Sequence, residues 1–135
     1  MRTVFADSNV FLRFFVVDDQ GQHEKAARLV HNAASGKVSL VAGPPVLFEI
    51  AWTLRSAYGQ SRGKVLEVLS AIASMPGLRL VDADLVEEAI TLARQSDQEF
   101  ADAYIAVSSH EAGADEIATF NRRHFERMGV ALAEL

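Results

Sequence analysis

Four polar residues of this chain are poorly explained by packing, helix capping or solvation. They are Asp7, Glu49, Asp102 and Asn121. Three carry carboxylates and the fourth an amide, and such oxygen donors suit Mg²⁺ or Mn²⁺ rather than Zn²⁺. The four histidines are not spaced as the ligands of an alternative metal site. A metal held by few carboxylates keeps coordination positions for water and a phosphate oxygen, so these residues point to metal-assisted phosphodiester hydrolysis.

Asp102 lies in a segment with the apolar spacing of an amphipathic helix, which predicts that one stripe faces a core. The stripe consists of Phe100, Ala103, Tyr104 and Val107. No Lys or Arg stands next to Asp102 or one turn further along. Ser96 and Glu99 predict a capping box that puts Asp102 in the second turn, near the positive end of the helix dipole. Asp102 is then either a half-exposed acid stabilised by that dipole or part of a functional site.

Glu49 is the one acid of a helix expected to begin at Pro45 and to end before Gly59. Its neighbours are mostly apolar, and no basic residue lies three or four positions further on. Burying an unpaired carboxylate is costly. One interpretation is a glutamate at the edge of the apolar face, paired across space with an arginine. We favour the other, a metal ligand or an acid–base group.

Strands and helices alternate along the chain, which predicts an α/β fold with a largely parallel sheet of about four to five strands and helices on both faces. The expected strands are residues 3–6, 37–42, 78–81, 116–120 and 130–132. One expected helix begins directly after residues 7–9. The other expected helices cover residues 23–34, 45–58, 61–75 and 85–94, and the last one ends near Gly113. Asp82 and Asp84 are expected to cap the helix at 85–94. Ligands bind at the carboxyl ends of strands in such folds, where Asp7 and Asn121 should lie.

Composition limits the classes of protein that this chain fits. With 135 residues, half of them hydrophobic, it should form a single domain over residues 1–135. The absence of cysteine excludes disulfides and thiolate metal sites and favours a cytoplasmic location, and no membrane span or signal segment is visible. A net charge of -5 argues against binding nucleic acid by bulk electrostatics. It leaves room for an enzyme whose acids line one cleft.

Four segments together resemble the motifs of PIN-domain nucleases, most closely the VapC-type toxins of bacterial toxin-antitoxin pairs. The segments are residues 7–13 (DSNVFLR), Glu49, residues 100–106 (FADAYIA) and residues 119–125 (TFNRRHF). Each motif is weak alone, but their order and spacing in a chain of this length are specific. The resemblance covers essentially the whole sequence and implies a PIN-like fold.

The resemblance implies an endoribonuclease that depends on Mg²⁺ or Mn²⁺. Asp7 and Asp102 would hold the metal, and Glu49 would complete the acidic cluster. Asn121 matches the position of the family's fourth acid, so the site has one negative charge fewer, which affects a second metal site more than the first. We hypothesise that the metal lowers the pKa of a bound water, which attacks the phosphate in line.

Several further residues match or neighbour this site. Ser8 and Thr119 match positions where the family places a hydroxyl near the metal, although a cap and a strand-end hydroxyl explain them equally well. Asp97 and Asp115 are nearby acids that could replace the missing charge, but we interpret them as a helix cap and a loop residue. The candidates for binding the RNA backbone are Arg13, Arg122 and Arg123, with a solvated face as the alternative.

The resemblance also implies two protein partners, a cognate antitoxin that covers the acidic site and a second copy in a homodimer. In the sequence, only the surplus of apolar residues at 10–15 and 46–54 indicates an interface. Three other functions stay open. They are a PIN-like binding module weakened by Asn121, an RNA-processing or DNA-directed PIN nuclease, and a phospho-accepting receiver-like domain. The receiver lacks support because one acid rather than an acidic pair follows the first strand, and no lysine ends a late strand.

Overall fold

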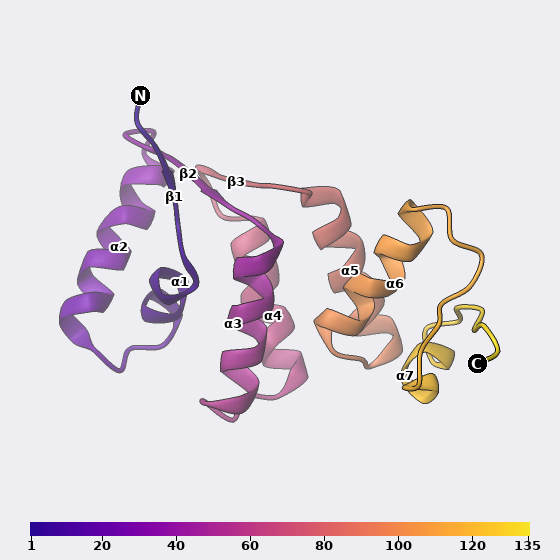
Figure 1. Ribbon diagram of the computed structural model, residues 1–135. Helices are drawn as coiled ribbons and strands as arrows, with labels where there is room; N and C mark the ends of the chain where they lie inside the picture. The colour runs from indigo at the N-terminus through magenta and orange to yellow at the C-terminus, as the bar shows by residue number, and fades with distance from the viewer.

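A computed structural model describes residues Met1–Leu135 as seven helices and a sheet of three parallel strands (Figure 1). The strands are β1 (Thr3–Phe5), β2 (Ser39–Ala42) and β3 (Leu78–Leu80), in the spatial order β1-β2-β3. The helices are α1 (Ser8–Phe15), α2 (Gln20–Ala34), α3 (Pro44–Ser56), α4 (Arg62–Ala73), α5 (Ala83–Ser96), α6 (Phe100–Glu111) and α7 (Arg122–Glu126). The α/β class and the parallel sheet are therefore confirmed. None of these helices has both the length and the apolar character needed to cross a membrane.

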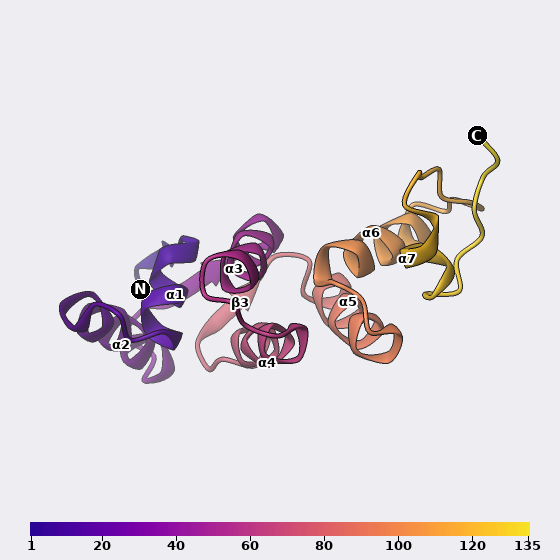
Figure 2. The same ribbon diagram turned by 90° about the horizontal axis from the view of Figure 1, so that it is seen from below.

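All four helices between the strands lie on one side of the sheet (Figures 1 and 2). The spatial order of the strands is the same as their order in the chain. Right-handed connections from β1 to β2 and from β2 to β3 therefore place their helices on the same face of the sheet. On the other face Val41 is buried, but its neighbours Phe5 and Arg79 in the paired strands are exposed. The expectation of helices on both faces is wrong for this sheet.

The expected fourth and fifth strands do not join the sheet, so the prediction of four to five strands is also wrong. Ile117 and Leu132 form one isolated parallel bridge, in which the Ile117 N–H donates to the Ala131 carbonyl over 2.9 Å. β1 consequently pairs only with β2, and its other edge has no partner. The segments at 116–120 and 130–132 instead stand beside α6 and α7, away from the sheet (Figure 1).

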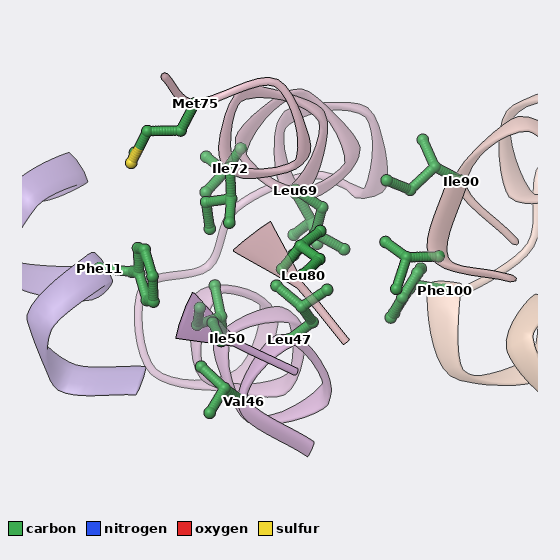
Figure 3. Packing of buried hydrophobic residues seen from close by; sticks show 14 of the residues in the cluster. Phe11, Val46, Leu47, Ile50, Leu69, Ile72, Met75, Leu80, Ile90 and Phe100 are labelled. Atoms are coloured by element: carbon green, nitrogen blue, oxygen red, sulfur yellow. The ribbon is translucent and has the colours of Figure 1, made fainter. Parts of the chain in front are cut away.

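One continuous core holds the sheet and most helices together. It contains 24 buried residues and extends from Ala6, at the end of β1, to Ala103 in α6. Ile50, Leu69 and Leu80 lie together in its middle, whereas Phe11 lies at the side toward α1 and Phe100 at the side toward α6 (Figure 3). A second, small cluster of Ala106, Ile117 and Phe125 lies in the C-terminal part.

The predicted capping box at the start of α6 is wrong. Ser96 is the last residue of α5, and its hydroxyl donates to the Leu92 carbonyl over 2.6 Å. Glu99 is the N-cap residue of α6, but its carboxylate accepts hydrogen bonds from Arg55 rather than from the backbone. Because α6 begins at Phe100, Asp102 lies in the first turn instead of the second, closer to the positive end of the dipole.

The prediction of two capping aspartates at α5 is also corrected. Asp82 is the N-cap residue, but it has a left-handed backbone (φ 55°) and its side chain makes no capping hydrogen bond. Asp84 lies within the first turn, where its charge faces the positive end of the helix dipole. Asp97, as interpreted from the sequence, stands at the other end of α5 as its C-cap residue.

Candidate active site

The first group of predicted site residues lies where β1 passes into α1. Asp7 is the N-cap residue of α1, and its Oδ1 accepts a hydrogen bond from the Ser8 N–H over 2.8 Å. The buried Ser8 hydroxyl donates to Oε1 of Glu49 over 2.6 Å. Ser8 therefore links the first turn of α1 to α3, because it donates one hydrogen bond to Asp7 and another to Glu49.

Glu49 is exposed, which removes the cost that the sequence suggested for its burial. The buried side of α3 is formed by Val46, Leu47, Ile50 and Leu54. Glu49 points away from this side, and its hydrogen-bond partner is a hydroxyl rather than the arginine considered from the sequence. A carboxylate that keeps contact with water and spends one oxygen on a hydroxyl remains able to bind a cation.

The second group gathers where α6 and α7 meet. The Nδ1 atom of His124 lies 3.0 Å from Oδ2 of Asp102 and 2.8 Å from Nδ2 of Asn121. The N–H of Asn121 donates to Oγ1 of Thr119 over 2.9 Å, which holds the loop before α7 in place. The Asp102 side chain is 21% exposed and that of His124 is 42% exposed, so the pair lies at the surface with the carboxylate partly covered.

The proton position on His124 decides which of these two contacts is a hydrogen bond. When Nδ1 carries the proton, it donates a hydrogen bond to the Asp102 carboxylate. A 180° rotation of the Asn121 amide then brings its Oδ1, a second acceptor, to the position near Nδ1 that Nδ2 occupies. Nε2 then keeps its lone pair, and it makes no hydrogen bond to the protein. A neutral imidazole oriented by a carboxylate in this way is suited to take a proton from water.

His124 belongs to this group although the sequence did not single it out. The four histidines were judged only as a metal set, and their spacing argued against one. A signal was present, because His124 follows Asn121 by three positions at the start of a helix, and residues at this spacing share a face. Its approach to Asp102, 22 positions earlier, depends on the packing of α7 against α6.

The two groups do not meet within one chain. β1 and α1 lie on one side of the α3–α4 pair, whereas α6 and α7 lie on the other (Figures 1 and 2). No three His, Cys, Asp or Glu side chains come close enough together to hold a metal ion. The predicted ligands Asp7 and Asp102 have the oxygen donors that Mg²⁺ prefers. The residues of a single chain nevertheless do not fit the expected magnesium site, because the structure keeps these two carboxylates apart.

A groove between α3 and α6 leads to Asp102. Its walls include Trp52, Arg55, Glu99 and Ala101. Trp52 is 71% exposed, and Arg55 pairs with Glu99 at 3.0 Å. An exposed indole beside a carboxylate–imidazole pair offers a stacking surface for a base next to a group that can accept a proton.

The sequence profile of the PIN domain matches residues 4–131. The chain belongs to the PIN domain family. Members of this family are usually metal-dependent nucleases that use divalent ions such as Mg²⁺. A comparison with curated proteins gives no match. The match extends over both groups of acidic residues, so the general nuclease assignment covers the whole candidate site.

The arginines predicted to bind RNA differ in their surroundings in this PIN domain. Arg13 donates to Asp18 over 3.0 Å, to Gln22 over 2.6 Å and to the Tyr58 hydroxyl over 3.3 Å. These bonds give Arg13 a structural explanation, because they join α1, α2 and the end of α3. Arg122 donates to the Ala133 carbonyl over 3.0 Å, and Arg123 is exposed and makes no hydrogen bond or ion pair with the protein.

Replacing Tyr58 by Phe should raise the pKa of Asp18 toward its ordinary value. The Tyr58 hydroxyl, which donates to Asp18 over 2.8 Å, is the largest cause of the lowered pKa of that carboxyl, and the charge of Arg13 adds to it. Because the pKa of Asp18 is lower in the folded protein than the value of about 4 in the unfolded chain, the ionised carboxylate stabilises the fold at any pH above about 4. This stabilisation is lost as the pH falls through the lower pKa of the folded state. An NMR titration of the Asp18 carboxyl carbon measures the shift. Tyr104→Phe is the control and should leave this titration unchanged, and an unaltered Asp18 pKa in Tyr58→Phe would contradict the assignment.

Proposed function

We propose that this PIN domain is a metal-dependent endoribonuclease, the VapC-type toxin of a type II toxin-antitoxin system, and that it hydrolyses RNA phosphodiester bonds in the cytoplasm. The family match over residues 4–131 supports nuclease activity in general. The observation that carries the finer proposal is the convergence of Asp102, His124 and Asn121 beside a groove with an exposed tryptophan. Stacking on an exposed indole favours single-stranded nucleic acid, whose bases are accessible.

The residues of this groove have distinct roles in the proposed reaction. Asp102 holds the His124 ring through Nδ1. Nε2 of His124 takes the proton from a water molecule while the water oxygen forms a bond to phosphorus and the bond to the leaving sugar oxygen breaks. Solvent supplies the proton that the leaving oxygen takes up. Trp52 stacks against a base and Arg123 pairs with a phosphate of the backbone.

The proposed partners are an RNA substrate, a cognate antitoxin and a second copy of this chain. The antitoxin would cover the acidic residues and thereby block the groove. The exposed Trp52 lines the same groove as Asp102, and Ile105 is exposed one turn further along α6. This apolar surface suits a protein that must compete with RNA there. The proposed ion is Mg²⁺ or Mn²⁺, and this part of the proposal is supported by the family, whose members typically use divalent metals, rather than by the distances between the acidic residues.

Cleavage of a mixed panel of tRNA and rRNA by the purified protein tests this proposal. We expect cleavage with Mg²⁺ or Mn²⁺ and none with EDTA, and the products should appear as discrete fragments that identify internal cuts. Single-stranded and duplex DNA of matched sequence should remain intact. Cleavage of DNA would replace the proposal with a DNA-directed nuclease, and tight RNA binding without cleavage would replace it with a binding module.

Replacing Arg123 by Gln should weaken RNA binding and flatten its salt dependence. Removing one phosphate interaction lowers the slope of log affinity against log salt concentration by about 0.7 for single strands. Fluorescence anisotropy of a labelled RNA across a salt series measures this slope. Arg28→Gln, an exposed change of the same charge on α2, is the control and should keep the wild-type slope. Equal slopes for Arg123→Gln and wild type would remove Arg123 from the binding surface.

A further inference from the structure

The groove between α3 and α6 has the size and the lining of a site for a nucleobase. Its volume is about 540 Å³, which lies within the range of about 300–1,000 Å³ that is common for small-molecule sites. Trp52 is exposed at its wall, and the more buried rings of Phe48 and Phe100 also line it. An indole stacks with any of the four bases, so Trp52 supplies affinity without choosing among them.

Glu99 supplies a polar group that can choose. Its Oε1 accepts hydrogen bonds from Nε and Nη2 of Arg55, over 3.1 and 3.0 Å. Nη1 of Arg55 donates to the Gln60 carbonyl over 2.9 Å, so the guanidinium is itself held in place. Oε2 of Glu99 accepts no hydrogen bond from the protein. One oxygen of this carboxylate is therefore fixed, and the other keeps two lone-pair positions for donors.

The free oxygen of Glu99 lies in the same groove as the indole. Trp52 and Arg55 are three positions apart on α3, so their side chains share a face of that helix, and Arg55 holds Glu99. The side chains of Arg55 and Glu99 are 41% and 38% exposed. Because ion pairs this exposed contribute little to stability, stability alone gives little reason for a carboxylate at this place.

The chemistry of a carboxylate favours one base. An ionised carboxylate only accepts hydrogen bonds, so it needs a partner that presents donors side by side. Guanine does so, because N1–H and the N2 amino group are adjacent on its Watson–Crick edge. Adenine and cytosine set an acceptor nitrogen next to their amino group, and uracil sets its single N–H between two carbonyl oxygens. Guanine is thus the base that meets the carboxylate without turning a lone pair toward it.

We propose that this groove binds a guanine base of single-stranded RNA, which stacks on Trp52 and donates from N1 and N2 to Glu99. That the guanine belongs to RNA rests on the proposed function, whereas recognition of the base does not. Asp102 lines the same groove and contacts His124. A guanine bound there brings the adjoining phosphate toward this pair, so cleavage should fall beside guanosines.

The fluorescence of Trp52 tests the base preference without reference to cleavage, since it is the only tryptophan of the chain. The probes are short single-stranded RNAs of uridine with one central guanosine, adenosine, cytidine or inosine, titrated in EDTA. We expect the guanosine probe to bind about 10-fold more tightly than the adenosine probe, because a hydrogen bond to a charged group is worth at least this factor. Inosine, which keeps N1–H but lacks the amino group, should lie between them. Absence of quenching, equal affinities, or a preference for adenosine or cytidine would overturn the proposal.

Glu99→Gln should abolish the preference for guanosine over adenosine, because an amide donates as well as accepts and fits both bases. Glu87→Gln, the same change of charge at an exposed position on α5, is the control and should keep the preference. A purely structural role of Glu99 would weaken the binding of all probes alike. An unchanged ratio of the two affinities in folded Glu99→Gln would therefore overturn the proposal.

Cleavage of the RNA panel separates this proposal from the proposed function. A guanosine preference in EDTA from a protein that cleaves no RNA with Mg²⁺ would contradict the proposed function and leave the guanine site intact. Cleavage at sites without a neighbouring guanosine, by a protein whose tryptophan fluorescence shows no base preference, would leave the nuclease and overturn the guanine site.

Discussion

Asp102→Asn should lower RNA cleavage by about 100-fold or more while the protein remains folded, because general acid–base groups contribute 10²–10⁴-fold. The amide keeps the size of the carboxylate but loses its charge. In the wild-type protein, Oδ2 of Asp102 lies 3.0 Å from Nδ1 of His124. The uncharged amide no longer stabilises a proton on that nitrogen, and it is a much weaker ligand for a divalent cation. Initial rates of cleavage of a fluorescent RNA at saturating Mg²⁺ measure the loss, and circular dichroism checks the fold.

Asp84→Asn is the matched control for this experiment. Asp84 lies in the first turn of α5 as Asp102 lies in the first turn of α6, so both substitutions remove a favourable interaction with a helix dipole, worth about 0.3–1 kcal/mol. Asp84 is exposed and contacts neither group of site residues. Full activity in Asp84→Asn with a large loss in Asp102→Asn would assign the effect to the site. Similar activities for the two variants would show that Asp102 serves only the helix.

The elements of this fold were largely predictable because their signals are local. Apolar spacing, prolines and glycines placed β1 to β3 and the helices that connect them, and the structure confirms these elements. The capping box at Ser96 and Glu99 was wrong for a physical reason. Asp97, the residue after Ser96, adopts a left-handed conformation that ends α5 at Ser96. Glu99 accepts hydrogen bonds from Arg55, which is distant in sequence.

The arrangement of the C-terminal part was not predictable from local patterns. Residues 116–120 have the composition of a strand, but whether a strand joins a sheet depends on which edge is within reach, and that is a property of the whole chain. The same limit applies to the site. Asp7, Ser8 and Glu49 meet because α1 and α3 pack together, and Asp102 meets His124 because α6 and α7 do. The sequence named most of these residues but assigned them to a single cluster.

Gly77→Ala should destabilise the protein far more than Gly36→Ala, although the two glycines have nearly the same left-handed backbone, with φ of 80° and 79°. Placing a side chain in this conformation costs about 1–2 kcal/mol at either position. At Gly36 the added methyl group meets no atom within 4 Å. At Gly77 it would lie 2.0 Å from the carbonyl oxygen of Ala33, the backbone that ends α2 against the sheet.

The clash at Gly77 cannot be relieved by rotating a side chain, because the atom that it meets belongs to the backbone. Ala33 is buried, and its carbonyl also accepts the hydrogen bond from the Gly36 N–H that ends the helix. The Gly77 carbonyl in turn accepts from the Leu40 N–H of β2, so a shift on either side would disturb the sheet. We therefore expect Gly77→Ala to lower the free energy of unfolding by at least about 2 kcal/mol more than Gly36→Ala, in line with the cost of overpacking. Urea unfolding of both variants measures the difference, and equal midpoints would mean that α2 and the turn before β3 are not in close contact.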